Sequence, residues 1–165
     1  MIKSVLFIDI DGVLNRSSKI YATPVVMVGD IMTMADPELV YRLNLLVDRT
    51  GAESVLSSSW RHAPDWRETM RASGIVKEFL DRTPRYSSCK KYGIQKDELC
   101  RGHNIQDWLD AHKVERYAIL DDAADMLASQ LPNFFRTNMA HGLTQEIADA
   151  VEKHLLGSLV HVNDT

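Results

Sequence analysis

The sequence contains little of what marks secreted, membrane-spanning or nucleic-acid-coating proteins. Its two cysteines, Cys89 and Cys100, are too few for a disulfide framework and lack metal-site spacing. No apolar run approaches the roughly 18 residues that span a bilayer, and two aspartates interrupt the apolar N-terminus before it could form a signal peptide. A net charge of −4 offers no excess of Lys and Arg for coating nucleic acid. We therefore expect a cytoplasmic protein without a membrane partner.

Repeats, low-complexity tracts and Pro/Gly-rich linkers are also absent from the sequence. Hydrophobic residues make up 45% of the chain and charged residues 25%, which is the composition of a soluble globular domain. We expect one domain over residues 1–157 and a C-terminal tail over residues 158–165. The sequence leaves the oligomeric state open.

Apolar runs that end in acidic or hydroxyl residues alternate with amphipathic segments. Helix signals are clearest at Asp36-Pro37, where a capping residue precedes proline, and at Gly51, a C-terminal stop. Residues 12–35 are expected to be irregular, and Trp60, Trp66 and Trp108 to serve in packing. This alternation predicts an α/β domain with a mostly parallel sheet flanked by helices, whose ligands bind at the carboxyl ends of the strands. The predicted strands are 4–10, 54–56, 117–120 and 134–137, and the predicted helices are 37–50, 66–72, 102–112 and a last one capped by Thr144.

Three of these strand ends carry polar groups, namely Asp9-Ile10-Asp11-Gly12, Ser57-Ser58 and Asp121-Asp122. Taken singly, each group could be a turn or a helix cap. Their joint occurrence after apolar strands instead indicates a site. Clustered carboxylates repel one another, which raises their pKa values unless a cation lies among them. Because Mg²⁺ prefers carboxylate, water and phosphate oxygens, it is the expected cofactor.

This set of residues suits the hydrolysis of a phosphate ester. Asp9 can attack phosphorus and form an aspartyl-phosphate intermediate, which divides the reaction into two easier steps. Asp11 can protonate the leaving oxygen and later activate water. Gly12 lets the chain turn while its backbone approaches the phosphate. A serine hydroxyl and a cation would hold the remaining phosphoryl oxygens.

Three segments, FIDIDGVLN, VLSSSWR and AILDDAAD, resemble the first, second and fourth motifs of haloacid dehalogenase (HAD) superfamily phosphatases. The resemblance implies a single Rossmann-like HAD domain in which Asp9 is the nucleophile and Asp11 the acid and base. It implies Ser57 as the phosphate-binding hydroxyl, with Ser58 as the close competitor. The implied metal residues are Asp9, Asp11, Asp121 and Asp122, of which either Asp121 or Asp122 completes the metal shell.

The third motif of this superfamily is a Lys or Arg that steadies the nucleophile and the phosphate. Arg101 heads the helix before the 117–120 strand, about where the family has this residue. Its guanidinium would be a fixed cation capable of bidentate binding. Lys96, about one turn earlier, is the alternative cation. Arg101 could instead be a solvated surface residue with no role in the site.

Four segments are similar to sequences of a HAD branch found in polynucleotide kinase-phosphatases and RNA repair proteins, namely DIDGVLN, LSSSWR, RGHNIQDWL and ILDD. The segments between motifs leave room for only a minimal cap, which implies an open site. The loop over residues 82–96 carries five basic residues and two tyrosines without an acid. Such a loop can bind phosphates and stack bases, or it can be a plain solvated loop. Its substrate-binding candidates are Lys90, Lys91 and Lys96.

The function that follows is a Mg²⁺-dependent phosphomonoesterase acting on nucleotides or on 3′- or 5′-phosphorylated nucleic-acid ends. A phosphatase for a small metabolite or a phosphoprotein is the alternative within enzymes. A receiver-like phosphoacceptor domain would have its acidic pair at the first strand, whereas here the pair comes late in the chain. A non-catalytic binding module is disfavoured because every required side-chain type is present.

Overall fold

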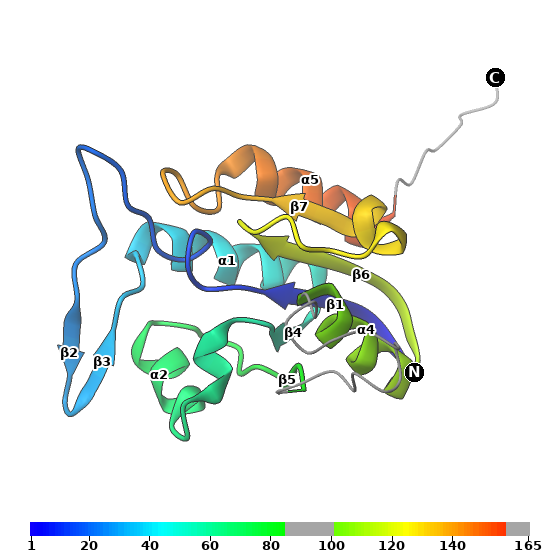
Figure 1. The fold of residues 1–165 in the computed structure, drawn as a ribbon, viewed down its shortest axis with the longest axis horizontal. Helices are drawn as coiled ribbons and strands as arrows, with labels where there is room; N and C mark the ends of the chain where they lie inside the picture. Colours follow the sequence, from blue (N-terminus) through cyan, green and yellow to red (C-terminus); the bar gives the residue numbers. More distant parts are fainter. Residues whose placement is uncertain (85–100, 158–165) are drawn as a thin grey trace.

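The computed structural model describes residues 1–84 and 101–157. Its centre is a five-stranded sheet in the order β5-β4-β1-β6-β7, and all neighbouring strands run parallel (Figure 1). This arrangement confirms the predicted α/β class with a mostly parallel sheet. The strands are β1 (Ile2–Ile8), β4 (Glu53–Leu56), β5 (Asp81–Arg82), β6 (Val114–Asp121) and β7 (Phe134–Arg136).

Helices cover both faces of the sheet because strand β1 is apolar on both sides. Leu6 and Ile8 belong to a core shared with α1 (Pro37–Thr50), α2 (Trp66–Ala72) and α5 (Gln145–Leu156). The alternate residues Val5 and Phe7 pack against Ile105 and Trp108 of α4 (Arg101–Ala111) on the other face. Within the described part of the chain, no helix is both long and apolar enough to cross a membrane.

The predicted helix boundaries agree closely with the structure. Asp36 caps α1 by accepting a hydrogen bond from the Glu38 backbone N–H, and Gly51 ends the helix in the left-handed region at φ 65°. Helix α2 has the predicted bounds, α4 begins one residue early, and Thr144 caps α5. Trp66 and Trp108 are buried packing residues, as expected.

The prediction that residues 12–35 are irregular is wrong. They contain an antiparallel hairpin, β2 (Val26–Val28) and β3 (Ile31–Thr33), that projects beyond the carboxyl ends of the central strands (Figure 1). Its strands have three residues each, and all of β2 is exposed, so no buried alternation marks them in the sequence. Arg82, assigned to an aperiodic loop, ends the two-residue strand β5. Two 3₁₀ turns, Ser59–His62 and Ala128–Asn133, were also not predicted.

Candidate active site

The parallel sheet brings the polar strand ends together. Strand β1 ends at Ile8, two residues before the predicted end, so that Asp9 is the first residue beyond it. The Asp9 backbone N–H donates to the Leu120 carbonyl of β6, and the Ser57 N–H donates to the Ile8 carbonyl, both at 2.9 Å. These bonds extend the ladder past the strands. Asp9 therefore lies between the ends of β4 and β6, the two strands that flank β1 in the sheet.

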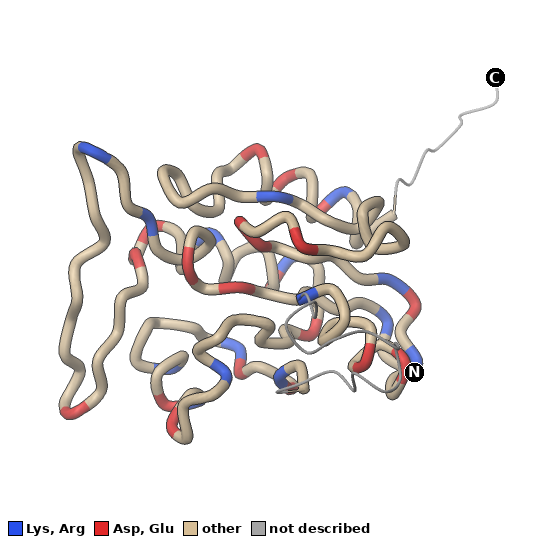
Figure 2. Tube along the Cα trace, viewed as in Figure 1, with Lys and Arg blue, Asp and Glu red and all other residues tan. Residues whose placement is uncertain are grey.

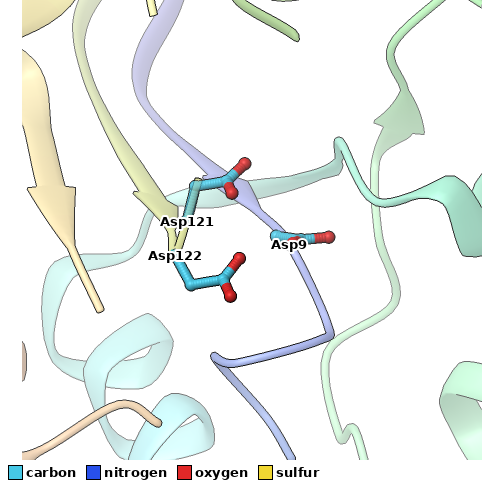
Figure 3. A group of neighbouring side chains, drawn as sticks. All are labelled: Asp9, Asp121 and Asp122. Carbon is cyan, nitrogen blue, oxygen red and sulfur yellow. The ribbon is translucent and has the colours of Figure 1, made fainter. Parts of the chain in front are cut away.

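Three carboxylates converge at the ends of β1 and β6 (Figure 3). One oxygen each of Asp9, Asp121 and Asp122 lies within 4.8 Å of the others. Asp9 and Asp121 are buried. Burial raises the pKa of Asp121 to about 7, an effect that the charge of Arg101 opposes and that of Asp9 reinforces. Burial, followed by repulsion from Asp9, also raises the pKa of Asp122.

This acidic group fits a divalent cation. Its donors are all carboxylate oxygens, which is the set that hard ions such as Mg²⁺ prefer. A cation would also lower the raised pKa of Asp121 by offsetting the repulsion among the three charges. The predicted metal residues Asp9, Asp121 and Asp122 thus come together, whereas the Asp11 carboxylate is not part of the group.

Arg101 lies against the same carboxylates. Its Nη1 is 2.7 Å from Asp9 Oδ1 and 3.0 Å from Asp121 Oδ2. Burial opposes its charge, but the two carboxylates outweigh this effect, so the pKa of Arg101 lies above its usual value. Arg101 thus faces Asp9 and Asp121, and its role as the third-motif cation stays a prediction, while the alternative, Lys96, lies outside the described residues.

The start of helix α4, and with it Arg101, is held by the segment that follows β6. Asp125 accepts the Arg101 backbone N–H through its carboxylate at 2.9 Å and the Gly102 N–H through its carbonyl at 3.1 Å. The buried Gln130 side chain donates to the Gly102 carbonyl at 2.8 Å. A Cβ on Gly102 would come within 2.6 Å of the Leu127 backbone nitrogen. This close packing sets the direction from which Arg101 approaches Asp9.

Ser57 and Ser58 follow β4, and both are completely buried. Within the described residues the Ser57 hydroxyl has no hydrogen-bond partner, whereas the Ser58 hydroxyl accepts the Trp60 backbone N–H at 3.4 Å. A buried hydroxyl without a partner is costly unless a ligand supplies one. This difference favours Ser57 over Ser58 as the phosphate-binding serine.

Arg61, four residues after Ser57, holds the second motif in shape. Its Nη1 donates to the carbonyls of Ser57 and Ser58, each at 2.8 Å. Arg61 is 7% exposed, and its Nε has no partner among residues 1–84 and 101–157. Burial, and then the charge of Arg101, lowers the pKa of Arg61 to about 10, which leaves it charged at neutral pH. Two guanidinium groups thus lie near Asp9.

Asp11 faces a different set of neighbours. Its Oδ1 accepts from Asn15 Nδ2 at 2.7 Å and its Oδ2 from the Trp60 indole N–H at 3.1 Å. Asn15 also accepts the Gly12 backbone N–H at 3.0 Å, which closes the turn after β1. At Gly12 the φ angle is +69°, and a Cβ would lie 2.7 Å from the Asp122 carboxyl carbon. Only glycine fits this position.

Sequence reasoning missed Arg61, Trp60, Asn15 and Gln130. The first three lie within the segments FIDIDGVLN and VLSSSWR, but side-chain type alone did not distinguish them from surface or packing residues. Gln130 had no signal, because it acts through a contact with Gly102, 28 residues away. The predicted substrate-binding residues Lys90, Lys91 and Lys96 lie outside the described residues, so their role stays a prediction.

Comparison with known proteins agrees with this geometry. A family model described as the HAD domain in Swiss Army Knife RNA repair proteins matches residues 5–148. The chain therefore belongs to this family of HAD domains, and it is a HAD-type hydrolase domain whose acidic group fits a divalent metal. The search of curated proteins returned no match.

Among solved structures, the chain is similar to a protein described as a HAD superfamily (subfamily III A) hydrolase from Legionella pneumophila. The two share 11% identity at a TM-score of 0.41, over 94% of this chain and 84% of that one.

Proposed function

We propose that this protein is a Mg²⁺-dependent phosphomonoesterase that works through an aspartyl-phosphate on Asp9. One observation carries the proposal. The Asp9 carboxylate, the Arg101 guanidinium and a Ser57 hydroxyl with no partner in the described chain meet at the ends of adjacent strands. A nucleophile, a fixed cation and an open hydrogen-bond donor are the three groups that a phosphoryl group needs around it.

In the first step an Asp9 oxygen attacks phosphorus, and a P–O(Asp9) bond forms as the ester P–O bond breaks. The electron pair of the broken bond stays on the leaving oxygen, which takes a proton from Asp11 and departs as an alcohol. The indole of Trp60 and the amide of Asn15 each hold one Asp11 oxygen, so the carboxyl group keeps a fixed direction.

In the second step a water oxygen attacks phosphorus and gives one proton to Asp11. The P–O(Asp9) bond breaks, its electron pair returns to the Asp9 carboxylate, and inorganic phosphate leaves. One ester and one water thus become one alcohol and one phosphate, and both aspartates return to their starting states.

The cations would stabilise the phosphoryl group through both steps. Arg101 approaches from the Asp121 side, and the Ser57 hydroxyl donates from the β4 side. Mg²⁺, when bound by Asp9, Asp121 and Asp122, would draw negative charge from the phosphoryl oxygens. Arg101 holds the Asp9 carboxylate in a fixed direction through their ion pair, and a nucleophilic carboxylate requires this orientation.

For the substrate we propose nucleotides or 3′- or 5′-phosphorylated nucleic-acid ends. Two observations support this class: the family is named for RNA repair proteins, and between β1 and α1 the described chain adds only the hairpin β2–β3, which is too small to be a cap domain. An open site admits a bulky leaving group. Small metabolites and phosphoproteins are the alternatives.

The experiment measures phosphate release from a panel of nucleoside monophosphates, 3′- and 5′-phosphorylated oligonucleotides, sugar phosphates and an aryl phosphate, with Mg²⁺ or a chelator. Acid quenching during turnover, borohydride reduction and peptide mapping would locate the acyl phosphate. We expect Mg²⁺-dependent release and a reduced residue at Asp9. A protein that releases phosphate from none of these esters, or whose reduced residue is not Asp9, would contradict the proposal.

A further inference from the structure

A second polar pocket lies beside the candidate site, at the ends of strands β4 and β5. It has a volume of about 230 Å³, and Arg61, Arg82 and Thr83 are among its lining residues. Strands β4 and β5 are parallel neighbours with Leu56 opposite Arg82, so the residues that follow them lie next to each other. The Thr83 backbone N–H donates to the Leu56 carbonyl at 2.9 Å, which continues this pairing.

The pocket repeats a feature of the candidate site. Thr83 is 1% exposed, and its hydroxyl has no hydrogen-bond partner in residues 1–84 and 101–157, as is true of the Ser57 hydroxyl. The two hydroxyls follow adjacent strands, and adjacent strands lie about 4.8 Å apart. Two neighbouring buried hydroxyls of this kind indicate two positions for hydrogen-bond acceptors, one beside the other.

Two arginines line the second position. The Arg61 Nε is also without a partner in the described chain, while its Nη1 is fixed on the Ser57 and Ser58 carbonyls. Arg82 lies against Arg61, because its Nη1 donates to the Arg61 backbone carbonyl. Asp81, the one carboxylate among the described residues that line the pocket, accepts the Trp108 indole N–H at 2.7 Å, so one of its oxygens is already occupied.

We propose that this pocket is a second anion site, in which Arg61, Arg82 and Thr83 bind a substrate phosphate other than the scissile one. The inference rests on the proposed function, because it takes the Asp9 site as the place of the scissile phosphate. A substrate with two phosphates on one nucleotide unit would fill both positions. A nucleoside 3′,5′-bisphosphate and a terminally phosphorylated oligonucleotide both supply this chemistry.

The test uses binding, so that its result does not depend on turnover. Calorimetry in Mg²⁺ would compare a nucleoside monophosphate, the 3′,5′-bisphosphate and a terminally phosphorylated oligonucleotide, each titrated into the Asp9→Asn protein. We expect the second phosphate to tighten Kd by about tenfold or more, the usual effect of hydrogen bonds to a charged group. An oligonucleotide that binds more tightly than the bisphosphate would identify a nucleic-acid end as the source.

Two variants in the same background remove the second site. Thr83→Val deletes the hydroxyl at nearly constant volume, and Arg82→Gln removes an exposed charge while keeping a polar side chain at the end of β5. Each should reduce the preference for the second phosphate to threefold or less. Thr137→Val is the matched control, because Thr137 follows β7 at the opposite sheet edge and has a buried hydroxyl that lacks a partner in the described residues.

Equal Kd values for the monophosphate and the bisphosphate in the Asp9→Asn protein would overturn the second site. So would a preference that survives both Thr83→Val and Arg82→Gln, or one that Thr137→Val removes equally. Failure of the proposed function is separate, since it would appear as absent phosphate release from the wild-type protein whatever the Kd values are.

Discussion

The two halves of the sheet's carboxyl edge have opposite chemistry. The ends of β1 and β6 form an acidic half, made of Asp9, Asp121 and Asp122. The ends of β4 and β5 form a basic half, in which Arg61 and Arg82 accompany buried hydroxyls. Figure 2 shows acidic residues after β1 and at the end of β6, and basic residues beside β5 and at the start of α4.

Because of this difference, the two halves should contribute to binding a phosphate ester in different ways. Carboxylates cannot approach a phosphate unless a cation neutralises them, so the acidic half requires a metal. The basic half can bind anions without one. Arg101 connects the halves, because it contacts both Asp9 and Asp121. Its charge also adds to the effect of burial in lowering the pKa of Arg61. Variants of each half should therefore fail in different ways.

The largest effect should come from the nucleophile. Asp9→Asn keeps the shape but removes the attacking oxygen anion, so kcat on an aryl phosphate should fall by about 10³-fold or more. Circular dichroism should show an unchanged fold. Asp48→Asn, an exposed aspartate in α1, is the matched control and should retain wild-type activity. An Asp9→Asn protein within tenfold of wild type would remove Asp9 from this role.

Removal of the metal should abolish the function of the acidic half as a whole. A chelator should abolish activity and lower Tm, because the repulsion between Asp9, Asp121 and Asp122 is then no longer offset. Asp121→Ala and Asp122→Ala, made singly, should raise the Mg²⁺ concentration for half-maximal rate by about 10- to 100-fold, more for the direct ligand. If neither variant changes the Mg²⁺ requirement, the two aspartates do not hold the metal.

The role of Asp11 as acid and base should appear as a dependence of kcat on the leaving group. Asp11→Asn should reduce kcat on an alkyl phosphate by about 10²- to 10⁴-fold and much less on a nitrophenyl phosphate, because only the poor leaving group needs a proton. Trp60→Phe should give a weaker version of the same pattern, since it removes one hydrogen bond that orients Asp11. Equal losses on both esters would exclude Asp11 as the acid.

The smallest effect is a pH dependence of stability in the metal-free protein. Burial raises the pKa of Asp121 from 3.8 to about 7, so between these values the folded state holds more protons than the unfolded state. Stability should therefore fall as pH rises from 5 to 7, by on the order of 2 kcal/mol. Asp36 and Glu38 have lowered pKa values and affect stability only at lower pH.

Urea unfolding in chelator at several pH values checks this expectation. Asp121→Asn should flatten the profile, and so should saturating Mg²⁺, because each removes the cost of the buried charge. A wild-type profile that is flat or that rises over this interval would show that Asp121 stays ionised without metal.

Much of the fold could be read from the sequence because its signals are local. Asp36-Pro37 and Gly51 bound α1 through contacts within one turn of the helix. The β2–β3 hairpin was missed because β2 is fully exposed and β3 buries only Thr33, so no core imposes a period on its side chains. Strand β5 was missed because two residues are too few to form a pattern.

The acidic half of the site followed from the sequence, as did Ser57 at the end of β4, whereas Arg61 and Thr83 of the basic half did not. Asp9 and Asp121 stand directly after apolar strands, and a parallel sheet must bring such strand ends to one edge. Arg61 and Thr83 give no comparable signal. Their importance comes from buried polar atoms without partners in the described chain, and that property depends on which distant segments pack around them.

The sequence by itself determined the class of chemistry, because the order of residue types along apolar strands sets which side chains reach the sheet edge. Only the tertiary structure decided which cation faces Asp9, which serine is open and which aspartates converge. These outcomes depend on contacts such as the one between Arg101 of α4 and Asp9 after β1. Residues so far apart in the chain are brought together by burial of the core, which no local pattern encodes.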